Sequence, residues 1–188
     1  MSERGFVMPG DLIGTSEEFT PAEGTYEEGG EIFASATGRV SVNLNSRAIS
    51  ITSRTKTPPR LSLGDVVIGR VSDVKSSMVL VEMAHIKGKG EREFVSPGDA
   101  VIHVSNIKDS YVKDILTEFQ PFDIVKAKVI DVRNTRLSTL GEEFGVMKAF
   151  CTKCRGVLRK TENSSLKCSN CDRVETRKIS SDYGTGII

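Results

Sequence analysis

Cys151-Thr152-Lys153-Cys154 and Cys168-Ser169-Asn170-Cys171 contain every cysteine of this 188-residue chain. Two Cys-x-x-Cys pairs about a dozen residues apart can fold back as opposed knuckles, which brings four thiolates into a tetrahedron of the size that zinc prefers. Gly156 follows the first pair and is expected to let the chain turn. The sequence therefore predicts a zinc ribbon over residues 147–180 that holds one structural zinc ion, because four protein ligands leave no open position for catalysis. The predicted ligands are Cys151, Cys154, Cys168 and Cys171.

Paired cysteines have two other common uses. A disulfide framework needs an oxidising compartment, and the opening Met1-Ser2-Glu3-Arg4-Gly5-Phe6 lacks the charged-then-apolar layout of a secretory signal. A thioredoxin-like redox centre uses one Cys-x-x-Cys in a βαβ setting rather than two in a short β-rich tail. No apolar run approaches the roughly 20 residues that span a bilayer. With thiolate ligands, these features predict a cytoplasmic protein without a membrane partner.

Length and charge favour several small modules over one large domain. A ribbon of about 40 residues buries too little apolar surface to be stable without its metal. Residues 1–31 hold eight acidic residues against one basic residue, whereas residues 32–60 hold five basic residues and no acid. Residues 144–188 hold nine basic residues and four acids. The acidic head and basic tail suggest different partners for the two ends, although solvated faces alone would also explain the pattern.

Residues 1–58 predict a small all-β module. Arg39–Leu44 and Ala48–Thr52 alternate apolar with polar residues, which is the period of half-buried strands, and Asn45-Ser46 supplies the turn between them. Thr57-Pro58-Pro59-Arg60 disfavours both strand and helix and predicts a short stiff linker.

The sequence pattern of residues 61–143 predicts a β-barrel. The lysine- and glycine-rich stretch from His85 to Gly98 is expected to be a loop, and the apolar spacing of Ser110–Phe119 predicts one short helix. The expected strands are Val66–Val74, Met78–Met83, Ala100–Ser105, Ile124–Val132 and Arg136–Thr139. Five strands with a helix between the third and fourth is the element order of an oligonucleotide-binding (OB) barrel. The fold class is therefore mainly β, with three small domains and a tail over residues 181–188.

The motifs of this barrel resemble those of an S1 domain, an RNA-binding OB barrel first described in a ribosomal protein. The matching stretches are Gly64–Val71, Ala100–Ser105, Phe122–Ile130 and Arg136–Ser138. Together with Pro9-Gly10-Asp11, Gly24-Thr25-Tyr26 and Ile32–Ser35, and followed by the ribbon, the chain resembles the Csl-type cap subunits of the archaeal RNA exosome over about residues 8–180.

That resemblance implies a role. In the family, the amino-terminal module docks on a hexameric ring of phosphorolytic ribonuclease subunits, and the S1 domains face the entrance of the ring. Three cap subunits feed RNA 3′ ends into the ring, whose own subunits cleave. The ribbon end also contacts an archaeal primase-like protein.

One departure from the S1 pattern concerns base stacking. Many S1 domains carry aromatic side chains on strands two and three, whereas Ser77–Met83 contains none. Stacking contributes about 1–3 kcal/mol per base. RNA binding is therefore expected to be weak and mainly electrostatic, which suits a pore where three copies act together.

The candidate RNA-binding residues are basic side chains of the barrel and one histidine. His103 lies between Ile102 and Val104 and is expected to face outward, where the S1 resemblance places a nucleic-acid contact; a plain solvent-facing histidine fits the same pattern. Arg70 alternates in phase with Ile68, so it can instead lean over the barrel edge. The full set is Lys75, His103, Arg70, Lys126, Lys128 and Arg133, of which the basic members are candidate phosphate contacts.

Catalysis by this chain is not expected. Gly88 and Gly90 lack the Lys-Ser/Thr context of a phosphate loop, and two histidines give no credible Ser/His/Asp order. The acids of residues 1–31 are dispersed among glycines rather than clustered to hold two metal ions. The sequence thus predicts a non-catalytic exosome cap subunit that guides RNA, with an OB-plus-ribbon transcription or translation factor as the alternative.

Overall fold

The computed structural model describes residues 2–55, 58–89, 98–161 and 165–186. The chain forms two compact units, Met1–Thr57 and Pro58–Ile188, each of which is mainly β. The predicted barrel (61–143) and ribbon (147–180) both lie in the second unit, and their separation into two domains stays a prediction. No helix in the described ranges has the length and apolar character needed to cross a membrane.

The first unit consists of two small sheets that enclose one core. One sheet has the order β1-β6-β7-β3 and the other the order β2-β5-β4. The strands are β1 (Ser2–Val7), β2 (Leu12–Thr15), β3 (Thr20–Pro21), β4 (Thr25–Glu28), β5 (Glu31–Ala34), β6 (Gly38–Asn43) and β7 (Ala48–Ser53). Between them lie the buried side chains of Ile13, Ile32, Ala34, Val40, Val42, Ile49 and Ile51.

The predicted hairpin of this unit is confirmed, and its turn has a local cause. The Asn43 side-chain oxygen accepts hydrogen bonds from the backbone N–H groups of Asn45 and Ser46. Arg47 then takes a positive φ of 50° before β7 begins. The alternation in β6 and β7 places Val40, Val42, Ile49 and Ile51 on the core side.

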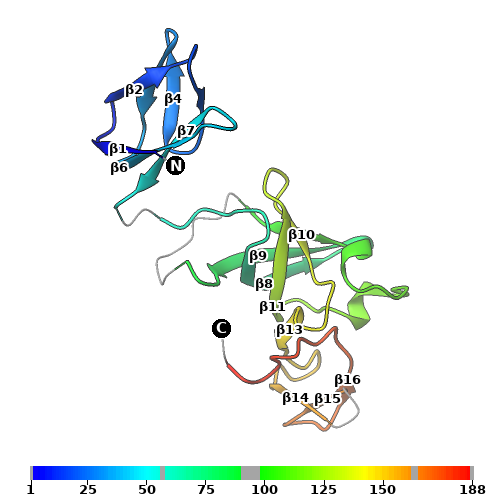
Figure 1. Cartoon of the computed structure of the whole chain (residues 1–188). Helices are drawn as coiled ribbons and strands as arrows, with labels where there is room; N and C mark the ends of the chain where they lie inside the picture. The colour runs from blue at the N-terminus through cyan, green and yellow to red at the C-terminus, as the bar shows by residue number, and fades with distance from the viewer. Residues whose placement is uncertain (1, 56–57, 90–97, 162–164, 187–188) are drawn as a thin grey trace. The chain divides into compact units, whose positions relative to one another are not determined.

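The second unit contains the predicted five-stranded barrel, which is closed. The strands are β8 (Val66–Val74), β9 (Met78–Ile86), β10 (Ala100–His103), β11 (Ile124–Asp131) and β12 (Arg136–Ser138). The sheet runs β12-β10-β9-β8-β11, and β12 pairs with both β10 and β11, which closes the barrel. A further strand, β13 (Gly145–Lys148), extends the sheet beside β11 (Figure 1).

The helix predicted for Ser110–Phe119 is wrong over most of its length. Only a 3-10 turn, η2 (Ile115–Thr117), forms there, and the Asp114 side chain accepts from the backbone N–H of Leu116 to begin it. Ile115 and Phe119 are buried, whereas Tyr111 is 89% exposed, so the apolar spacing does not mark one continuous buried face. Because a short helix in water gains little from propagation, the segment needs such a face to persist.

Two other expected boundaries also differ. The third strand ends at His103, because its imidazole Nδ1 accepts from the Ser105 backbone N–H and begins a 3-10 turn, η1 (Val104–Asn106). The second strand continues to Ile86, beyond the expected start of the loop at His85. Part of that loop, residues 90–97, lies outside the described residues.

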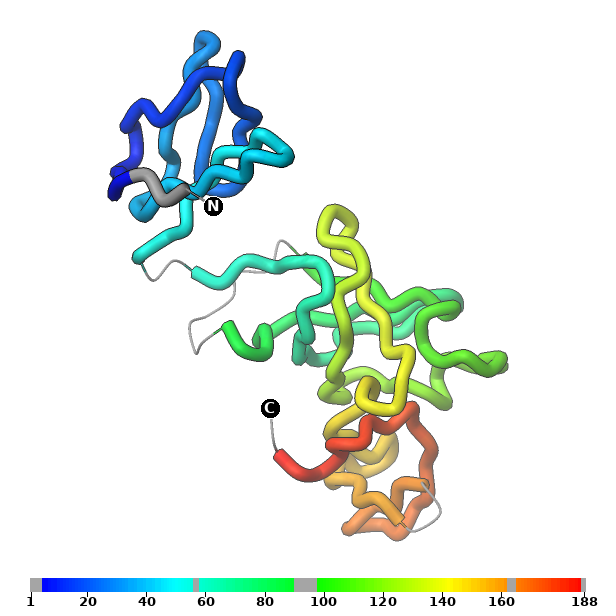
Figure 2. The backbone as a smooth tube through the Cα atoms, in the orientation of Figure 1, coloured from blue at the N-terminus to red at the C-terminus, as the bar shows by residue number. Residues whose placement is uncertain are grey.

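The ribbon is a three-stranded sheet in the order β14-β15-β16. Its strands are β14 (Leu158–Lys160), β15 (Leu166–Cys168) and β16 (Val174–Glu175). Leu158 and Leu166 belong to the same hydrophobic core as Val125 and Ile102 of the barrel. The tail returns to β13, because Ile179 bridges Val146 and the Gly184 N–H donates to the Met147 carbonyl. Figure 2 shows the red carboxy-terminal segment running back toward the yellow part of the chain.

Candidate functional site

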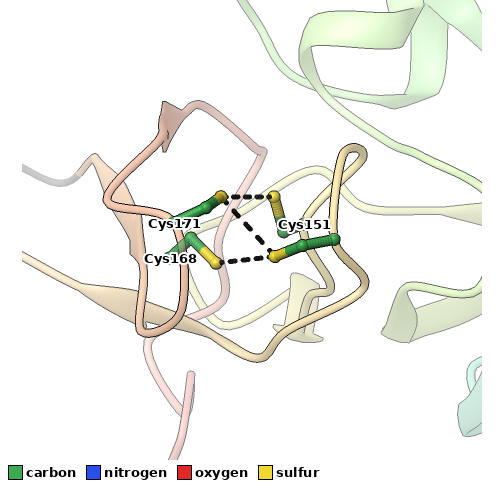
Figure 3. Close-up of side chains that lie close together, drawn as sticks. Cys151, Cys168 and Cys171 are labelled. Carbon is green, nitrogen blue, oxygen red and sulfur yellow. Dashed lines mark hydrogen bonds between the residues drawn. The ribbon is translucent and has the colours of Figure 1, made fainter.

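The four cysteine sulfur atoms form one compact cluster, here called the four-thiol centre. All four Sγ atoms lie within 4.8 Å of one another. The Sγ–Sγ distances are 3.6 Å for Cys151–Cys171, 3.3 Å for Cys154–Cys168 and 3.5 Å for Cys154–Cys171. A tetrahedron with metal–sulfur bonds of about 2.3 Å has edges of about 3.8 Å. The labelled side chains in Figure 3 point toward one another from two loops, so the cluster could bind a metal ion.

Each Cys-x-x-Cys pair ends in the same kind of turn. Arg155 and Asp172 directly follow the second cysteine of each pair, and they have φ values of 59° and 56°. The left-handed backbone at these two positions folds each pair back as a knuckle. Gly156 therefore serves a different purpose from the one expected. A Cβ there would lie 2.9 Å from the Asn170 side-chain amide, so glycine is needed for the close approach of the two knuckles.

The electrostatics of the four thiols favour a bound cation. The backbone N–H of Asn170, which donates to Cys168 Sγ, lowers the pKa of that thiol to about 7. The Gly156 N–H lowers the pKa of Cys154, but contacts with the other three sulfurs together with burial outweigh it and raise that pKa to about 12. Four thiols this close cannot all ionise beside one another unaided, whereas a divalent cation stabilises every thiolate.

A buried network of charges connects the barrel to the first knuckle. Arg177 Nε lies 2.8 Å from Asp123 Oδ2, and its Nη2 lies 2.8 Å from Glu175 Oε2. The side chains of Arg177, Asp123 and Glu175 are 2%, 0% and 7% exposed. Glu175 Oε1 in turn accepts from the Thr152 backbone N–H at 3.0 Å and from its hydroxyl at 2.8 Å. Thr152, one of the two residues between the first two cysteines, is thereby tied to the residue that precedes β11.

Burial and hydrogen bonding act in opposite directions on the two acids of this network. Burial raises the pKa of Asp123, and the Arg177 guanidinium opposes that rise without cancelling it. Burial also tends to raise the pKa of Glu175, but the hydrogen bonds from Arg177 and Thr152 outweigh it and lower that pKa. Sequence reasoning did not find this network, because its members carry no local motif.

Two of the predicted RNA-binding residues lie near each other at the β8–β9 turn. Lys75 is exposed, and its backbone N–H donates to the Met78 carbonyl at 2.8 Å. His103 pairs with Met78 across β9 and β10, and its ring is half-buried on the outer face of the barrel. The expected outward direction of His103 agrees with this burial, because its neighbour Ile102 is in the core.

The other predicted contacts are spread over the barrel. Lys128 and Arg133 are exposed, on β11 and on the turn that follows it. Arg70 is exposed on β8 and forms an ion pair with Glu82 at 2.6 Å. Lys126 is buried, and its ammonium pairs with Asp182 of the tail, so it is not available to a phosphate. The structure therefore does not bring the six predicted residues together on one patch.

The first unit carries an exposed apolar row. Leu12 and Tyr26 both pair with Phe33, across β2, β5 and β4. The Tyr26 and Phe33 rings stack with centroids 5.6 Å apart. Leu12 and Tyr26 are exposed and Phe33 is half-buried. Three large apolar side chains in register on an exposed sheet face are typical of a protein-binding surface.

The fold and the site together define an OB-barrel protein with a four-thiol centre that could hold a metal ion and an additional amino-terminal β unit. Residues 6–43 match the family model described as the Exosome complex exonuclease RRP4 N-terminal region. The chain is 45% identical to Exosome complex component Csl4 of Archaeoglobus fulgidus over 181 residues, which cover 96% of this chain and 98% of that protein.

Two further relatives carry related names. Human exosome complex component CSL4 is 28% identical over 153 residues, covering 77% of each chain. Exosome complex component Rrp4 of Methanopyrus kandleri is 31% identical over 137 residues, covering 70% of this chain and 51% of that protein. The chain belongs to the Csl4 family of exosome complex components.

Proposed function

We propose that this protein is a non-catalytic cap subunit of an archaeal exosome, which recruits RNA 3′ ends and guides them into a phosphorolytic ribonuclease ring. The observation that carries the proposal is the similarity to Archaeoglobus fulgidus Csl4, which extends over 96% of the chain and so includes both compact units. The relatives named above give no support to the alternative of a transcription or translation factor.

The four-thiol centre supports a structural rather than a catalytic metal, and we propose that the metal is zinc. It is the one group of metal-ligating side chains found among the described residues. Four thiolates in a compact tetrahedral arrangement suit zinc, and a zinc ion with four protein ligands has no open position for a substrate. When bound, the ion would neutralise the thiolates and hold the two knuckles together.

The first unit supplies the proposed contact with the ring. The apolar row of Leu12, Phe33 and Tyr26 offers area to bury. The exposed acids Glu28 and Glu31 pair with each other across β4 and β5, on the same face as Tyr26 and Phe33. Such an arrangement, with an apolar centre and a charged rim, is the usual anatomy of a protein interface. A basic partner surface would complement it.

The barrel supplies the proposed RNA path, through Lys75, His103, Lys128, Arg133 and Arg70. Lys126 is left out because its charge is already paired. Phosphate contacts by single exposed side chains give modest, salt-sensitive affinity, which suits a subunit that passes RNA onward. The exposed basic side chains of the ribbon are proposed as the contact for a primase-like protein, and the assembly is proposed to be cytoplasmic.

Reconstitution with purified ring subunits tests this function. Wild-type protein is expected to co-elute with the ring, whereas Leu12→Asp with Tyr26→Asp should abolish co-elution and leave RNA affinity unchanged. Lys75→Ala with His103→Ala should do the opposite, and should reduce the salt dependence of RNA binding by a log–log slope of about 0.7 for the lost phosphate contact. Failure of the wild type to join the ring, or RNA degradation by the isolated chain, would overturn the proposal.

A further inference from the structure

Phe122 is an exposed aromatic residue in a strained backbone conformation. It follows Pro121 in the turn before β11 and has a φ of 77°, in the left-handed region that favours glycine. The residue is 48% exposed. A bulky residue in this region costs of order 1–3 kcal/mol and persists where the surroundings fix it, commonly at a functional site. Partial burial of the residue does not offset that cost, which points to a ligand.

Two arginine guanidiniums from different parts of the second unit lie near this ring. The Arg155 guanidinium is 5.1 Å from the ring centroid, and the Arg70 guanidinium is 5.9 Å from it. Arg155 comes from the first knuckle and Arg70 from β8. Because Arg155 also has a positive φ, both sides of this contact are held by unusual backbone turns.

These three side chains line an open groove where the barrel meets the ribbon, here called the junction groove. Its volume is about 560 Å³, and its lining residues are Arg70, Phe122, Ile124, Phe150 and Arg155. The Lys148 ammonium lies 5.5 Å from the Phe150 ring centroid. Two phenyl rings and two guanidinium groups therefore line the groove, and the Lys148 ammonium lies beside one of the rings.

The balance of charge in the groove favours an anion. Arg70 pairs with Glu82, but both side chains are more than half exposed, and such a surface pair contributes at most about 1 kcal/mol. A phosphate can therefore compete for the Arg70 guanidinium. In the described part of the chain, Arg155 has no carboxylate within ion-pair distance.

A nucleotide uses both features of the groove. Bases stack on aromatic side chains with little regard to sequence, and guanidinium groups bind phosphate oxygens in a bidentate manner. An acidic peptide would satisfy the arginines but leave the phenyl rings uncovered, and an apolar peptide would do the reverse. The combination of an exposed ring, a half-buried ring and two exposed guanidiniums therefore favours single-stranded RNA over a protein segment.

We propose that the junction groove binds one nucleotide of single-stranded RNA, with its base on Phe122 or Phe150 and its phosphate on Arg155 and Arg70. The site rests on the proposed function in that RNA is its ligand. Its aromatic rings supply the stacking that strand β9 does not offer. It also adds a second contact surface, built partly by the ribbon, to the one proposed around Lys75 and His103.

The test uses full-length, zinc-loaded protein and a fluorescent oligouridylate. Phe122→Gly suits it because glycine adopts a φ of 77° without strain, so the fold should be retained or stabilised. Loss of one stacking contact is expected to weaken RNA binding about 5- to 150-fold. Phe122→Tyr, which keeps a stacking ring, should restore most of the affinity. Arg155→Gly should weaken binding and lower the log–log salt slope by about 0.7.

Photo-crosslinking of 4-thiouridine RNA gives a second readout, with adducts expected on the peptides around Phe122 and Phe150. Unchanged RNA affinity in folded Phe122→Gly, with a loss in Lys75→Ala, would overturn the groove while leaving the proposed function intact. Absence of RNA binding by the wild type would instead contradict the proposed function. If Phe122→Gly loses co-elution with the ring and keeps RNA affinity, the groove is a protein contact and the proposal is wrong.

Discussion

Replacing Arg177 by methionine should lower the free energy of unfolding by about 3–5 kcal/mol, the range for breaking a buried ion pair. Methionine keeps much of the side-chain volume but removes the cation between Asp123 and Glu175. Both carboxylates are almost fully buried, so neither can recover its lost partner from water. The upper part of the range is expected, because one guanidinium serves two acids.

The loss of unfolding free energy in Arg177→Met, here called the deficit, should depend on pH. In the native protein burial raises the pKa of Asp123, and Arg177 opposes the rise. Without Arg177 that pKa moves further above its unfolded value. A carboxyl whose folded pKa is raised destabilises the fold when it is ionised, so the deficit is largest above the folded pKa. It should shrink as the pH falls through that pKa, because Asp123 then becomes neutral.

Guanidinium unfolding in zinc-containing buffer, followed by circular dichroism, measures the effect. With a denaturant slope of about 4 kcal/mol per molar, a deficit of about 4 kcal/mol moves the midpoint down by about 1 M. Adding Asp123→Asn to Arg177→Met should recover part of the loss, because no buried charge then remains at position 123. Arg159→Met, at an exposed position of β14, is the control and should change stability by less than about 0.5 kcal/mol.

A deficit below about 1 kcal/mol for Arg177→Met would refute the reasoning, since it would mean that the two acids are solvated or neutral without their partner. A double variant no more stable than the single one would refute it as well. In that case lost packing, rather than the unpaired charge on Asp123, would account for the destabilisation.

Three further outcomes are expected. Cys168→Ser should abolish binding of about one zinc per chain, as measured by metal analysis, and retention of full zinc content would exclude the four-thiol centre as its site. Gly69→Ala should lower the free energy of unfolding by about 1–3 kcal/mol, as measured by thermal unfolding, because the added Cβ would lie 2.5 Å from a carbonyl oxygen of β9. Gly5→Ala is the control, since a Cβ there meets no atom within 4 Å. Asp182→Asn should release the tail from Lys126 and speed hydrogen exchange of the tail's backbone amides. In the wild type, the hydrogen bond from Lys126 lowers the pKa of Asp182. The same contact should therefore weaken as the pH falls through that pKa. Unchanged exchange in the variant would show that this ion pair does not hold the tail.

The barrel was largely predictable because its strands alternate. In β9, Val79, Val81 and Met83 are buried at every second position, which is the period of a half-buried sheet and can be seen in the local sequence. The strand Gly145–Lys148 was missed because three of its four residues are buried, which removes the alternation. The predicted helix failed for the opposite reason: Tyr111 completes an apolar period but lies on the surface.

The functional residues also divide into those that a local sequence motif predicts and those that only the fold brings together. The cysteine cluster was found because each Cys-x-x-Cys pair is local and its spacing is diagnostic. Arg177 and Asp123 are 54 positions apart, and no short motif joins them. Lys126 alternates like a surface residue, and only the returning tail reveals that it is covered. Phe122 belonged to a matched strand motif, and its positive φ and exposure are visible only in three dimensions.

The single hydrophobic core of barrel and ribbon bears on how genes for such proteins can be recombined. A crossover near Thr57 falls between two compact units and leaves both cores whole. A crossover between Ser138 and Gly145 would separate β13 from β11 and open a core to which Leu158 and Leu166 contribute. Natural shuffling and protein engineering should therefore move the barrel and the four-thiol centre as one heritable piece, while the amino-terminal unit remains free to be exchanged.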